Sequence, residues 1–373
     1  MTKRILSFVW FFIVILLFVF SVQYVKNESS EHNKQEIYSQ WQHKYIIKTP
    51  QGRYVNTSSR SENGVVLSEA QGYGMLISVL NNQDKASESQ FYDLYTYYKH
   101  HRVKGTYLMS WRYTNGDKQQ KQADLKNNAT DGDLYIAYAL ILASEKWSQH
   151  RSVYESTAKQ ILDDILKYNV NYNNNILTVG NWADGSSKYQ NLMRTSDVLP
   201  SFFDKFYKFS QNSQWLIIKN KMLDSLYQAS RKSKVGLVPD FIQVTNDNKV
   251  KSLTYGENVK LNKHDDDYYY NAFRIPYNLA LDKDRSSKEN QILIKLMNFF
   301  SSLEKISSGY NMSGKPLNKF QSTSISAPLF YAASTSQKWH TLYQKQSFIL
   351  DYDRLNHNYY DDTLLVLILY STK

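Results

Sequence analysis

Residues Ala129–Trp147 read ATDGDLYIAYALILASEKW, an acidic glycine turn that leads directly into an apolar segment. The apolar residues recur at the three- and four-residue spacing of one helix face, so this segment is predicted to be a packed helix. Asp131 and Asp133 stand at its start. One Asp there is an ordinary N-cap, which accepts backbone N–H groups and complements the helix dipole. The second Asp cannot share that capping role, so the turn is a candidate to present a carboxylate to a ligand.

A second motif lies upstream, where Leu67–Ile77 reads LSEAQGYGMLI. Glu69 stands there among glycines, an aromatic residue and apolar side chains. Burial among such neighbours disfavours the charged form and raises a carboxyl pKa, which a proton donor working near neutral pH requires. The dipole of a helix that starts at Ser68 favours the anion instead. A proton-donor role for Glu69 therefore requires desolvation and a second nearby carboxylate to outweigh the dipole.

Together the two motifs resemble glycoside hydrolase family 8, which carries a Ser-Glu-x-Gln-x-Tyr-Gly-Met motif and an Ala-Thr-Asp-Gly-Asp motif at a helix start. The likeness extends from about residue 40 to the C-terminus. It continues, in the family's order, through Leu108–Trp111, Leu199–Phe203, Val238–Phe241 and Tyr270–Pro276. The resemblance implies a glycoside-hydrolysing enzyme built as an (α/α)6 barrel, in which inner and outer rings of helices surround a long open cleft at one end.

The composition agrees with one large helical domain. The chain has 373 residues, of which 42% are hydrophobic, and it contains 7 Trp and 31 Tyr, enough apolar side chain to bury a sizeable core. No linker rich in Pro, Gly or Ser interrupts it, and helical periodicity is far more frequent than strand alternation. The prediction is an all-α fold, which the resemblance sharpens to an (α/α)6 barrel. The N-terminal residues add one predicted transmembrane helix to that barrel.

The N-terminus predicts a membrane anchor. From Ile5 to Val25 the chain is almost entirely apolar and long enough to cross a bilayer, and Lys3 and Arg4 precede it. An Ala-x-Ala cleavage pattern is missing, which favours an anchor over a cleaved signal peptide. We expect residues 1–25 to form a cytoplasmic tip and signal-anchor, residues 26–37 a flexible polar stalk, and residues 38–373 the catalytic domain.

This organisation predicts a single-pass protein of the cell membrane with its catalytic domain outside, or a secreted protein if the N-terminal segment is cleaved. The absence of Cys is compatible with that side of the membrane. The formal net charge is +11, but the basic residues are scattered and form no nucleic-acid motif. Such a charge favours an anionic envelope or an acidic polymer as partner, and it argues against a cationic substrate such as chitosan.

The resemblance assigns two catalytic residues by motif position. Inverting hydrolysis of a glycoside needs a protonated carboxyl for the leaving oxygen and a second group that activates water on the opposite face. Glu69 matches the family's general acid. Asp131 matches the aspartate that holds and helps distort the sugar at the point of cleavage. Neither role needs a metal ion or another cofactor, so none is expected.

The catalytic base is where this sequence departs from the best-known branch of the family. That branch has an Asp at the position of Asn271, and an amide cannot accept the proton. Another branch also has Asn there and takes a Glu from the upstream loop as its base. The candidates in this chain are Asp240 and Glu257. The acidic run 265–267, or the loss of any base, stays open as a further alternative.

Aromatic and polar residues beside these motifs are candidates for binding sugar, because aromatic rings pack against the apolar faces of pyranose rings. The set comprises Tyr73, Trp111, Trp182, Tyr270, Asn271 and Arg274. Arg274 is expected to form a hydrogen bond near the acid. A lone Trp is often a core residue, and this second interpretation is strongest for Trp182.

The sequence thus predicts a membrane-anchored extracellular endo-glycosidase that hydrolyses a β-linked polysaccharide, β-1,4 or mixed-linkage, with inversion. Trimming of an exopolysaccharide beside a polysaccharide synthase or export complex is one setting for such an enzyme. Two alternatives stay open: a polysaccharide-binding protein that kept the cleft but lost the base, and a secreted cellulase or chitosanase. Activity on glucans separates the first alternative from the main prediction, and cell fractionation separates the second.

Overall fold

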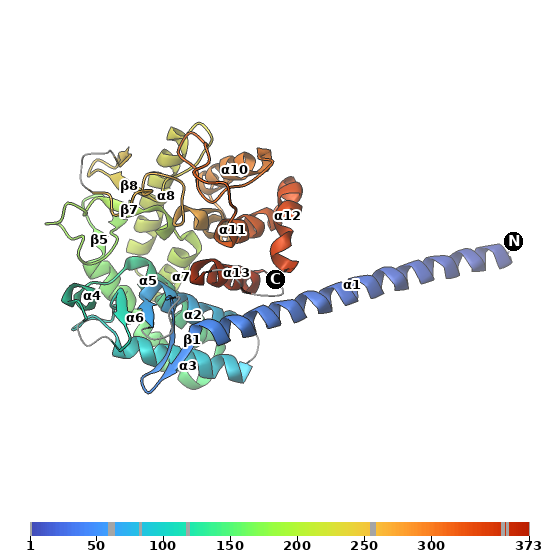
Figure 1. Cartoon of the computed structure of the whole chain (residues 1–373), viewed down its shortest axis with the longest axis horizontal. Helices are drawn as coiled ribbons and strands as arrows, with labels where there is room; N and C mark the ends of the chain where they lie inside the picture. Colours follow the sequence, from blue (N-terminus) through green and yellow to red (C-terminus); the bar gives the residue numbers. More distant parts are fainter. Residues whose placement is uncertain are drawn as a thin grey trace.

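The computed structural model describes residues 2–58, 64–81, 84–116, 120–253, 259–351, 355 and 358–372, and most of them are helical (Figure 1). The α-helices are α1 (Thr2–Tyr45), α2 (Ser68–Leu80), α3 (Asp84–His100), α4 (Gln122–Lys126), α5 (Thr130–Lys146), α6 (Arg151–Tyr168), α7 (Pro200–Ser210), α8 (Gln214–Lys232), α9 (Ile275–Ala280), α10 (Ser287–Ser302), α11 (Thr323–Ser334), α12 (His340–Gln346) and α13 (Tyr359–Ser371). The 3-10 helices are η1 (Ser148–His150), η2 (Thr195–Asp197), η3 (Ala272–Arg274), η4 (Gln337–Trp339) and η5 (Ser347–Asp351).

Two concentric rings of helices form the body of the protein. The inner ring runs α2, α5, α7, α9, α11 and α13, with each helix packed on the next and α13 closing back on α2. Of the inner helices, α2, α5, α7, α9, α11 and α13 are the main partners of the outer helices α3, α6, α8, α10, α12 and α1, respectively. The described residues therefore form the (α/α)6 barrel that the sequence predicts.

Small residues let the inner helices α2 and α5 approach each other closely. A Cβ atom built on Gly72 of α2 would lie 2.7 Å from the Cβ of Tyr135. One built on Gly132 of α5 would lie 2.6 Å from both the backbone carbon and the Cβ of Ser68. Real side chains do not pack at such distances. The glycines of the two sequence motifs thus bring the first turns of α2 and α5 together.

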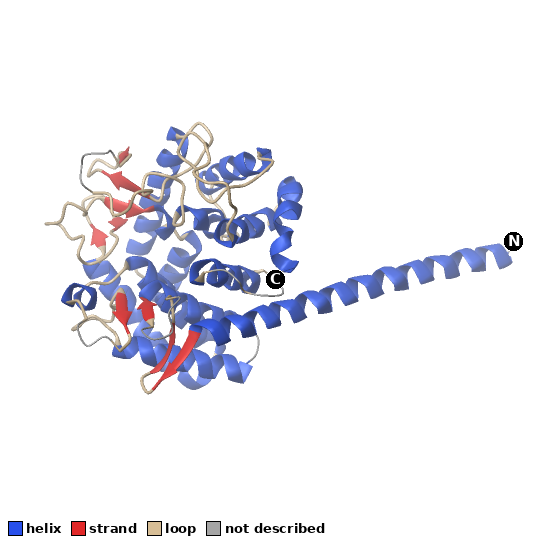
Figure 2. Ribbon diagram, in the orientation of Figure 1, coloured by secondary structure: helices blue, strands red, loops and turns tan. Residues whose placement is uncertain are grey.

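Short antiparallel strands lie in the connections between the helices. They are β1 (Ile46–Thr49), β2 (Gly52–Val55), β3 (Val65–Leu67), β4 (Arg112–Thr114), β5 (Val170–Asn171), β6 (Ile176–Leu177), β7 (Leu192–Arg194), β8 (Phe241–Val244) and β9 (Val250–Lys251). β1 pairs with β2, β3 with β4, and β5 with β6, while β7, β8 and β9 form a three-stranded sheet in that order. Figure 2 shows most of these strands on the side of the molecule away from the free end of α1.

Pairing between the strands positions two segments that matter for the site. Leu67 of β3 lies opposite Arg112 of β4, immediately before α2 begins. Arg194 of β7 lies opposite Phe241 of β8, immediately before η2 begins. The strands therefore hold the residues that enter α2 and η2 at one end of the barrel.

The helix α1 corrects the predicted domain boundaries. It runs through residues 2–45 without interruption, so the flexible stalk predicted for 26–37 is wrong. Neither Pro nor Gly breaks this stretch, and its Glu, Lys and Gln residues favour helix. Its C-terminal part is anchored by burial of Ile37, Tyr38 and Trp41. Contact with the barrel thus begins before the predicted boundary at residue 38.

The free end of α1 projects from one end of the barrel (Figure 1). Near its C-terminus, Tyr45 donates a 2.6 Å hydrogen bond to Asp362 in the first turn of α13. Further back, Lys34 lies 4.9 Å from the ring centroid of Tyr370 in the last turn of α13. The helix therefore runs back along α13 and leaves the barrel where the inner helices α13 and α2 end.

Among the described residues, no transmembrane helix is found at the predicted position Ile5–Val25. Within the described part of the chain, no helix combines the length and the apolar character that crossing a membrane requires.

Candidate active site

Glu69 lies in the first turn of α2, directly after the β3–β4 pair. Its side chain is 17% exposed, so the carboxyl reaches solvent at the mouth of the barrel. The neighbouring Ser68 N–H donates a 3.0 Å hydrogen bond to the carbonyl of Trp111, which places that residue's backbone beside the first turn. Glu69 is thus accessible and has an aromatic residue close to it in space.

Arg274, the last residue of η3, holds the Glu69 carboxyl from the buried side. One guanidinium nitrogen donates to Glu69 Oε1 and also to the Tyr73 hydroxyl, 2.5 Å away. The other donates to Ser196 Oγ at 2.8 Å and to Asn271 Oδ1 at 2.9 Å. Tyr73 in turn donates a 3.0 Å hydrogen bond to Glu69. Arg274 therefore lies against the predicted acid, in the place expected from the sequence, and it is held there by four acceptors.

Asp131 lies in the first turn of α5 and is paired with a different arginine. Arg194 forms an ion pair with Asp131 Oδ2, and the backbone N–H of Gly132 donates to Oδ1 at 2.9 Å. Burial raises the pKa of Asp131, but Arg194 and Arg274 outweigh it, so the net effect lowers that pKa below its ordinary value. Asp131 is therefore held as an anion.

Glu69 has the opposite electrostatic balance. Burial raises its pKa, the Arg274 guanidinium lowers it, and the nearby negative charge of Asp131 raises it again, with a net increase. Two neighbouring carboxyls whose environments move their pKa values apart are the usual arrangement of an acid beside a permanent anion. The site can therefore hold a protonated carboxyl next to a charged one.

Asp133, the second acid of the glycine turn, faces the protein interior. Its oxygens accept a 2.8 Å hydrogen bond from the Met109 N–H and a 2.7 Å hydrogen bond from Asn128. Burial raises the pKa of this carboxyl to about 8, against those two donors. Asp133 therefore fastens the segment before Trp111 to α5, and only Asp131 remains to meet a ligand.

Asp240, one of the two predicted base candidates, is 3% exposed and precedes β8. Its carboxylate accepts hydrogen bonds from the backbone N–H groups of Tyr269, Asn271 and Ala272 at 3.0, 3.1 and 2.8 Å. The Asn271 side-chain amide donates a fourth at 3.1 Å. Burial raises the pKa of Asp240 to about 6 in spite of these donors. A continuous chain of contacts thus joins Asp240 to Glu69 through Asn271 and Arg274.

Glu257, the other base candidate, lies outside the described residues. The carboxylates of the acidic run 265–267, later in the sequence, form hydrogen bonds and ion pairs with residues of their own loop. Asp265 accepts from the Asn262 N–H at 2.7 Å, Asp266 pairs with Lys260 at 2.5 Å, and Asp267 contacts His264 Nδ1 at 2.8 Å. These three carboxylates therefore have structural partners in the loop 260–267.

The structure divides the predicted sugar-binding residues into two groups. Tyr73 and Arg274 are completely or almost completely buried, so they support Glu69 and do not offer a surface to a sugar. Trp111, Trp182, Tyr270 and Asn271 are partly exposed. Because they are buried, Tyr73 and Arg274 do not contact sugar as the sequence predicted, but support Glu69.

The exposed aromatic residues are held by specific contacts. Trp111 donates from Nε1 to Asp124 at 3.1 Å. Trp182 meets Tyr189 edge-on, with ring centroids 5.1 Å apart. Tyr270 meets Tyr360 edge-on at 5.9 Å. Fixed aromatic rings of this kind are suited to stacking on pyranose rings.

Sequence reasoning missed the segment Arg194–Asp197, which spans the end of β7 and η2. This segment supplies the partner of Asp131 and, through Ser196, an acceptor for Arg274. Arg-Thr-Ser-Asp lies just before the recognised motif Leu199–Phe203. The charged residues Arg194 and Asp197, next to that motif, could have indicated that this segment belongs to the site.

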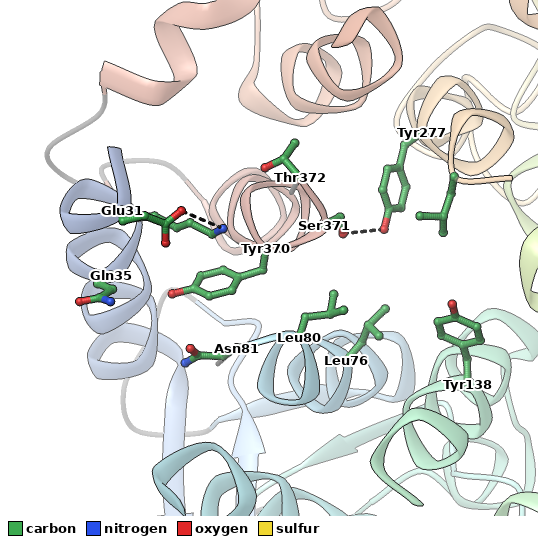
Figure 3. A pocket seen from close by; sticks show the side chains of 12 residues that line it. Glu31, Gln35, Leu76, Leu80, Asn81, Tyr138, Tyr277, Tyr370, Ser371 and Thr372 are labelled. Carbon is green, nitrogen blue, oxygen red and sulfur yellow. Dashed lines mark hydrogen bonds and ion pairs between the residues drawn. The ribbon is translucent and has the colours of Figure 1, made fainter. Parts of the chain in front are cut away.

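A cavity of about 560 Å³ lies at the other end of α2 (Figure 3). It is lined by Leu76, Leu80, Tyr138, Tyr277, Tyr370 and residues of α1. Leu80 is eleven residues beyond Glu69 on the same helix, or about 16 Å at 1.5 Å per residue. This cavity is therefore separate from the site around Glu69.

Comparison with known proteins agrees with the geometry. Residues 10–373 match the family model for glycosyl hydrolases family 8. A beta-glucanase of Niallia circulans is 28% identical over 342 residues, covering 87% of this chain and 80% of that protein. An endoglucanase of Bacillus sp. strain KSM-330 is 28% identical over 335 residues, covering 84% of this chain and 70% of that protein.

A solved structure of a beta-1,3-1,4-glucanase from Paenibacillus sp. X4 superposes with a TM-score of 0.81 at 25% identity and covers 92% of each chain. The match to the family model extends over nearly the whole chain. With the paired carboxyls of α2 and α5 in the (α/α)6 barrel, these findings place the chain in glycosyl hydrolase family 8, as a glycoside hydrolase.

Proposed function

We propose that this protein is an endo-acting hydrolase of a β-linked glucan, with β-1,4 or mixed linkages, and that it cleaves with inversion. The observation that carries the proposal is the pairing of Glu69, whose pKa is raised, with Asp131, whose pKa is lowered, on adjoining helix starts. Relatives named beta-glucanase and endoglucanase support a β-glucan as substrate.

In the proposed reaction, Glu69 donates its proton to the leaving glycosidic oxygen. The carboxylate that remains faces the guanidinium of Arg274 and the hydroxyl of Tyr73, which stabilise the negative charge as it develops. Asp131, held as an anion, accepts hydrogen bonds from sugar hydroxyls at the point of cleavage. Because both partners of Glu69 are already in place, little reorganisation accompanies the proton transfer.

We propose that one of two carboxyls, that of Asp240 or that of Glu257, activates the attacking water. A carboxylate offers about four lone-pair sites, and Asp240 already accepts four hydrogen bonds from the turn 269–272. That saturation supports a role for Asp240 in fixing Asn271 and Arg274. Comparison of D240N with E257Q separates the two roles: loss of the base lowers kcat and leaves binding of the polymer intact, whereas loss of a positioning group also alters the pH profile of the acid.

The test of the proposal is polymer cleavage by the purified protein. Mixed-linkage β-glucan, carboxymethylcellulose, xylan and chitosan are incubated with it, and new reducing ends are followed together with polymer size. We expect an early fall in polymer size on a β-glucan and an α-configured new reducing end by NMR. E69Q is expected to bind the polymer without turnover and to retain more activity on aryl glycosides with good leaving groups. Full polymer cleavage by E69Q would refute the proton-donor role.

We also propose that the segment Ile5–Val25 holds the enzyme at the cell membrane, with the barrel outside and within reach of an exopolysaccharide leaving its synthase or export complex. Support comes from the apolar composition of the segment and from the exposure of Trp10, Phe11 and Phe18 on α1, since large apolar side chains in water are unfavourable. Cell fractionation with an alkaline wash tests this proposal. Recovery of the full-length protein from the medium would contradict it.

A further inference from the structure

The last residue of η2, Asp197, is a buried carboxylate that the proposed mechanism does not use. It is 1% exposed. Arg194 approaches its Oδ1 to 3.7 Å, and neither carboxylate oxygen has a hydrogen-bond partner among the described residues. Burying a carboxylate without a close donor is unfavourable. A neighbouring charge must therefore compensate for it.

Asp197 lies between the two ion pairs of the site. Arg194, three residues before it, pairs with Asp131. Ser196, the residue before it, accepts a hydrogen bond from Arg274, which pairs with Glu69. η2 is itself held by Asn278, which donates to the Ser196 carbonyl at 2.9 Å. One short helical turn thus connects both catalytic carboxyls to a third.

The charged groups around Asp197 come from four elements. They are Arg194 from β7, Asp131 from α5, Arg274 from η3 and Glu69 from α2. The Tyr135 hydroxyl of α5 also faces this cluster, and burial keeps it neutral by raising its pKa further above 10. The cluster therefore contains two guanidiniums and three carboxyls.

These numbers determine how many protons the cluster holds. Guanidinium groups stay protonated, and a net charge in the protein interior is costly. Two positive charges balance two of the three carboxylates, so the balanced cluster contains one carboxyl proton. Asp131 is bound by Arg194 and by the Gly132 N–H, which keeps it anionic. The proton is therefore divided between Glu69 and Asp197.

We propose that Asp197 is a positioning residue for the proton of Glu69. The Asp197 carboxylate lies beside Arg194, and its negative charge, together with that of Asp131, balances the guanidinium groups of Arg194 and Arg274. Glu69 can therefore stay protonated to a higher pH than the charge of Asp131 alone would permit. This inference rests on the proposed function, because it concerns the same acid. In agreement with two carboxyls that compete for one proton, burial raises the pKa of Asp197 to about 7 and raises that of Glu69 as well.

The experiment measures kcat/KM against pH for the wild type and for D197N, D197E and D204N, on the β-glucan that the wild type cleaves. D197N removes the charge at nearly constant shape, and D197E restores it. D204N makes the same chemical change on α7, where Asp204 pairs with Lys219 away from the cluster. D197S is a second neutral variant, to be used if D197N does not fold.

The neutral variants are expected to move the alkaline limb of the profile about one pH unit lower, which is about a tenfold loss of kcat/KM above that limb. D197E and D204N are expected to keep the wild-type limb. An unmoved or raised limb in active D197N or D197S would overturn the inference. A wild type that cleaves no β-glucan would instead contradict the proposed function, so the two failures are distinguishable.

Discussion

Substitution of Gly132 by Ala tests the close contact that brings the two catalytic helices together. The added Cβ would lie 2.6 Å from the backbone carbon of Ser68, and backbone cannot rotate away as a flexible side chain can. Overpacking of a core costs about 1–3 kcal/mol, while Ala gains up to about 1 kcal/mol over Gly in a helix. Because backbone is involved, we expect a net loss of about 1–2 kcal/mol.

The same change should separate Glu69 from Asp131. Both residues lie next to the contact between Ser68 and Gly132, so a shift of α2 away from α5 moves the acid relative to the sugar-binding anion. Misplacement by about 1 Å can reduce a rate about a hundredfold. We expect G132A to lose about tenfold to a hundredfold in kcat/KM while remaining folded.

The measurement combines thermal unfolding with kinetics. A loss of 1–2 kcal/mol corresponds to a decrease in Tm of about 1–3 °C for a domain of this size, since the unfolding entropy is about 2.1 cal/mol/K per residue. G185A is the matched control, since a Cβ on Gly185 meets nothing within 4 Å. If G132A equals G185A in both Tm and kcat/KM, then the α2–α5 contact neither stabilises the fold nor positions Glu69 relative to Asp131.

Three further predictions concern the supports of the site. R274K keeps the positive charge, but the Lys side chain cannot reach all four acceptors of Arg274. Because hydrogen bonds to charged groups are worth about 1.5–3 kcal/mol each, we expect kcat to fall at least about tenfold while the circular dichroism spectrum is unchanged. A wild-type kcat would contradict this expectation. Asp133 has a pKa raised to about 8, so the stability it contributes is complete below its unfolded pKa of about 3.9 and is lost as pH rises through 8. Calorimetry should therefore show Tm decreasing more from pH 4 to 8 in the wild type than in D133N, and parallel curves would contradict the raised pKa of Asp133. W111A should raise KM for long glucans several-fold with little change in kcat, because Trp111 is partly exposed and its backbone is hydrogen-bonded to Ser68, the residue before Glu69. An unchanged KM would exclude Trp111 as a sugar platform.

The two catalytic helix starts could be predicted from the sequence because each lies within one continuous motif, whereas the (α/α)6 barrel followed from the family resemblance that those motifs carry. Glycine, carboxylate and apolar spacing are local properties, and α2 begins at Ser68 as expected. α5 begins at Thr130, so residues 131–133, which were predicted as a turn before the helix, already belong to its first turn. The α1 stretch 26–37 was mispredicted because its polar residues gain order only by propagation from a helix that is anchored at Ile37 and Trp41.

The supports of the site were harder to predict because they depend on tertiary contacts. Tyr73 is four residues from Glu69 on the same helix, yet its contacts with Arg274, 201 residues away, and with Tyr135 of α5 form only in the folded protein. Arg194 and Asp197 belong to a β-strand end and a 3-10 turn, which have no periodicity to indicate which way a side chain points. The pairing of Asp131 with Arg194 therefore depends on the tertiary fold, which brings the end of β7 to the start of α5.

The course of α1 along α13 has a practical consequence for handling the enzyme. Its projecting end leaves the barrel where α2 and α13 end, whereas Glu69 and Asp131 lie where α2 and α5 begin. A bead, a fusion partner or a fluorophore attached to that projecting end would leave the opposite face unobstructed. Immobilised through the projecting end of α1, the barrel would present the face that carries Glu69 and Asp131 outward, to polymers too long to diffuse into a confined site.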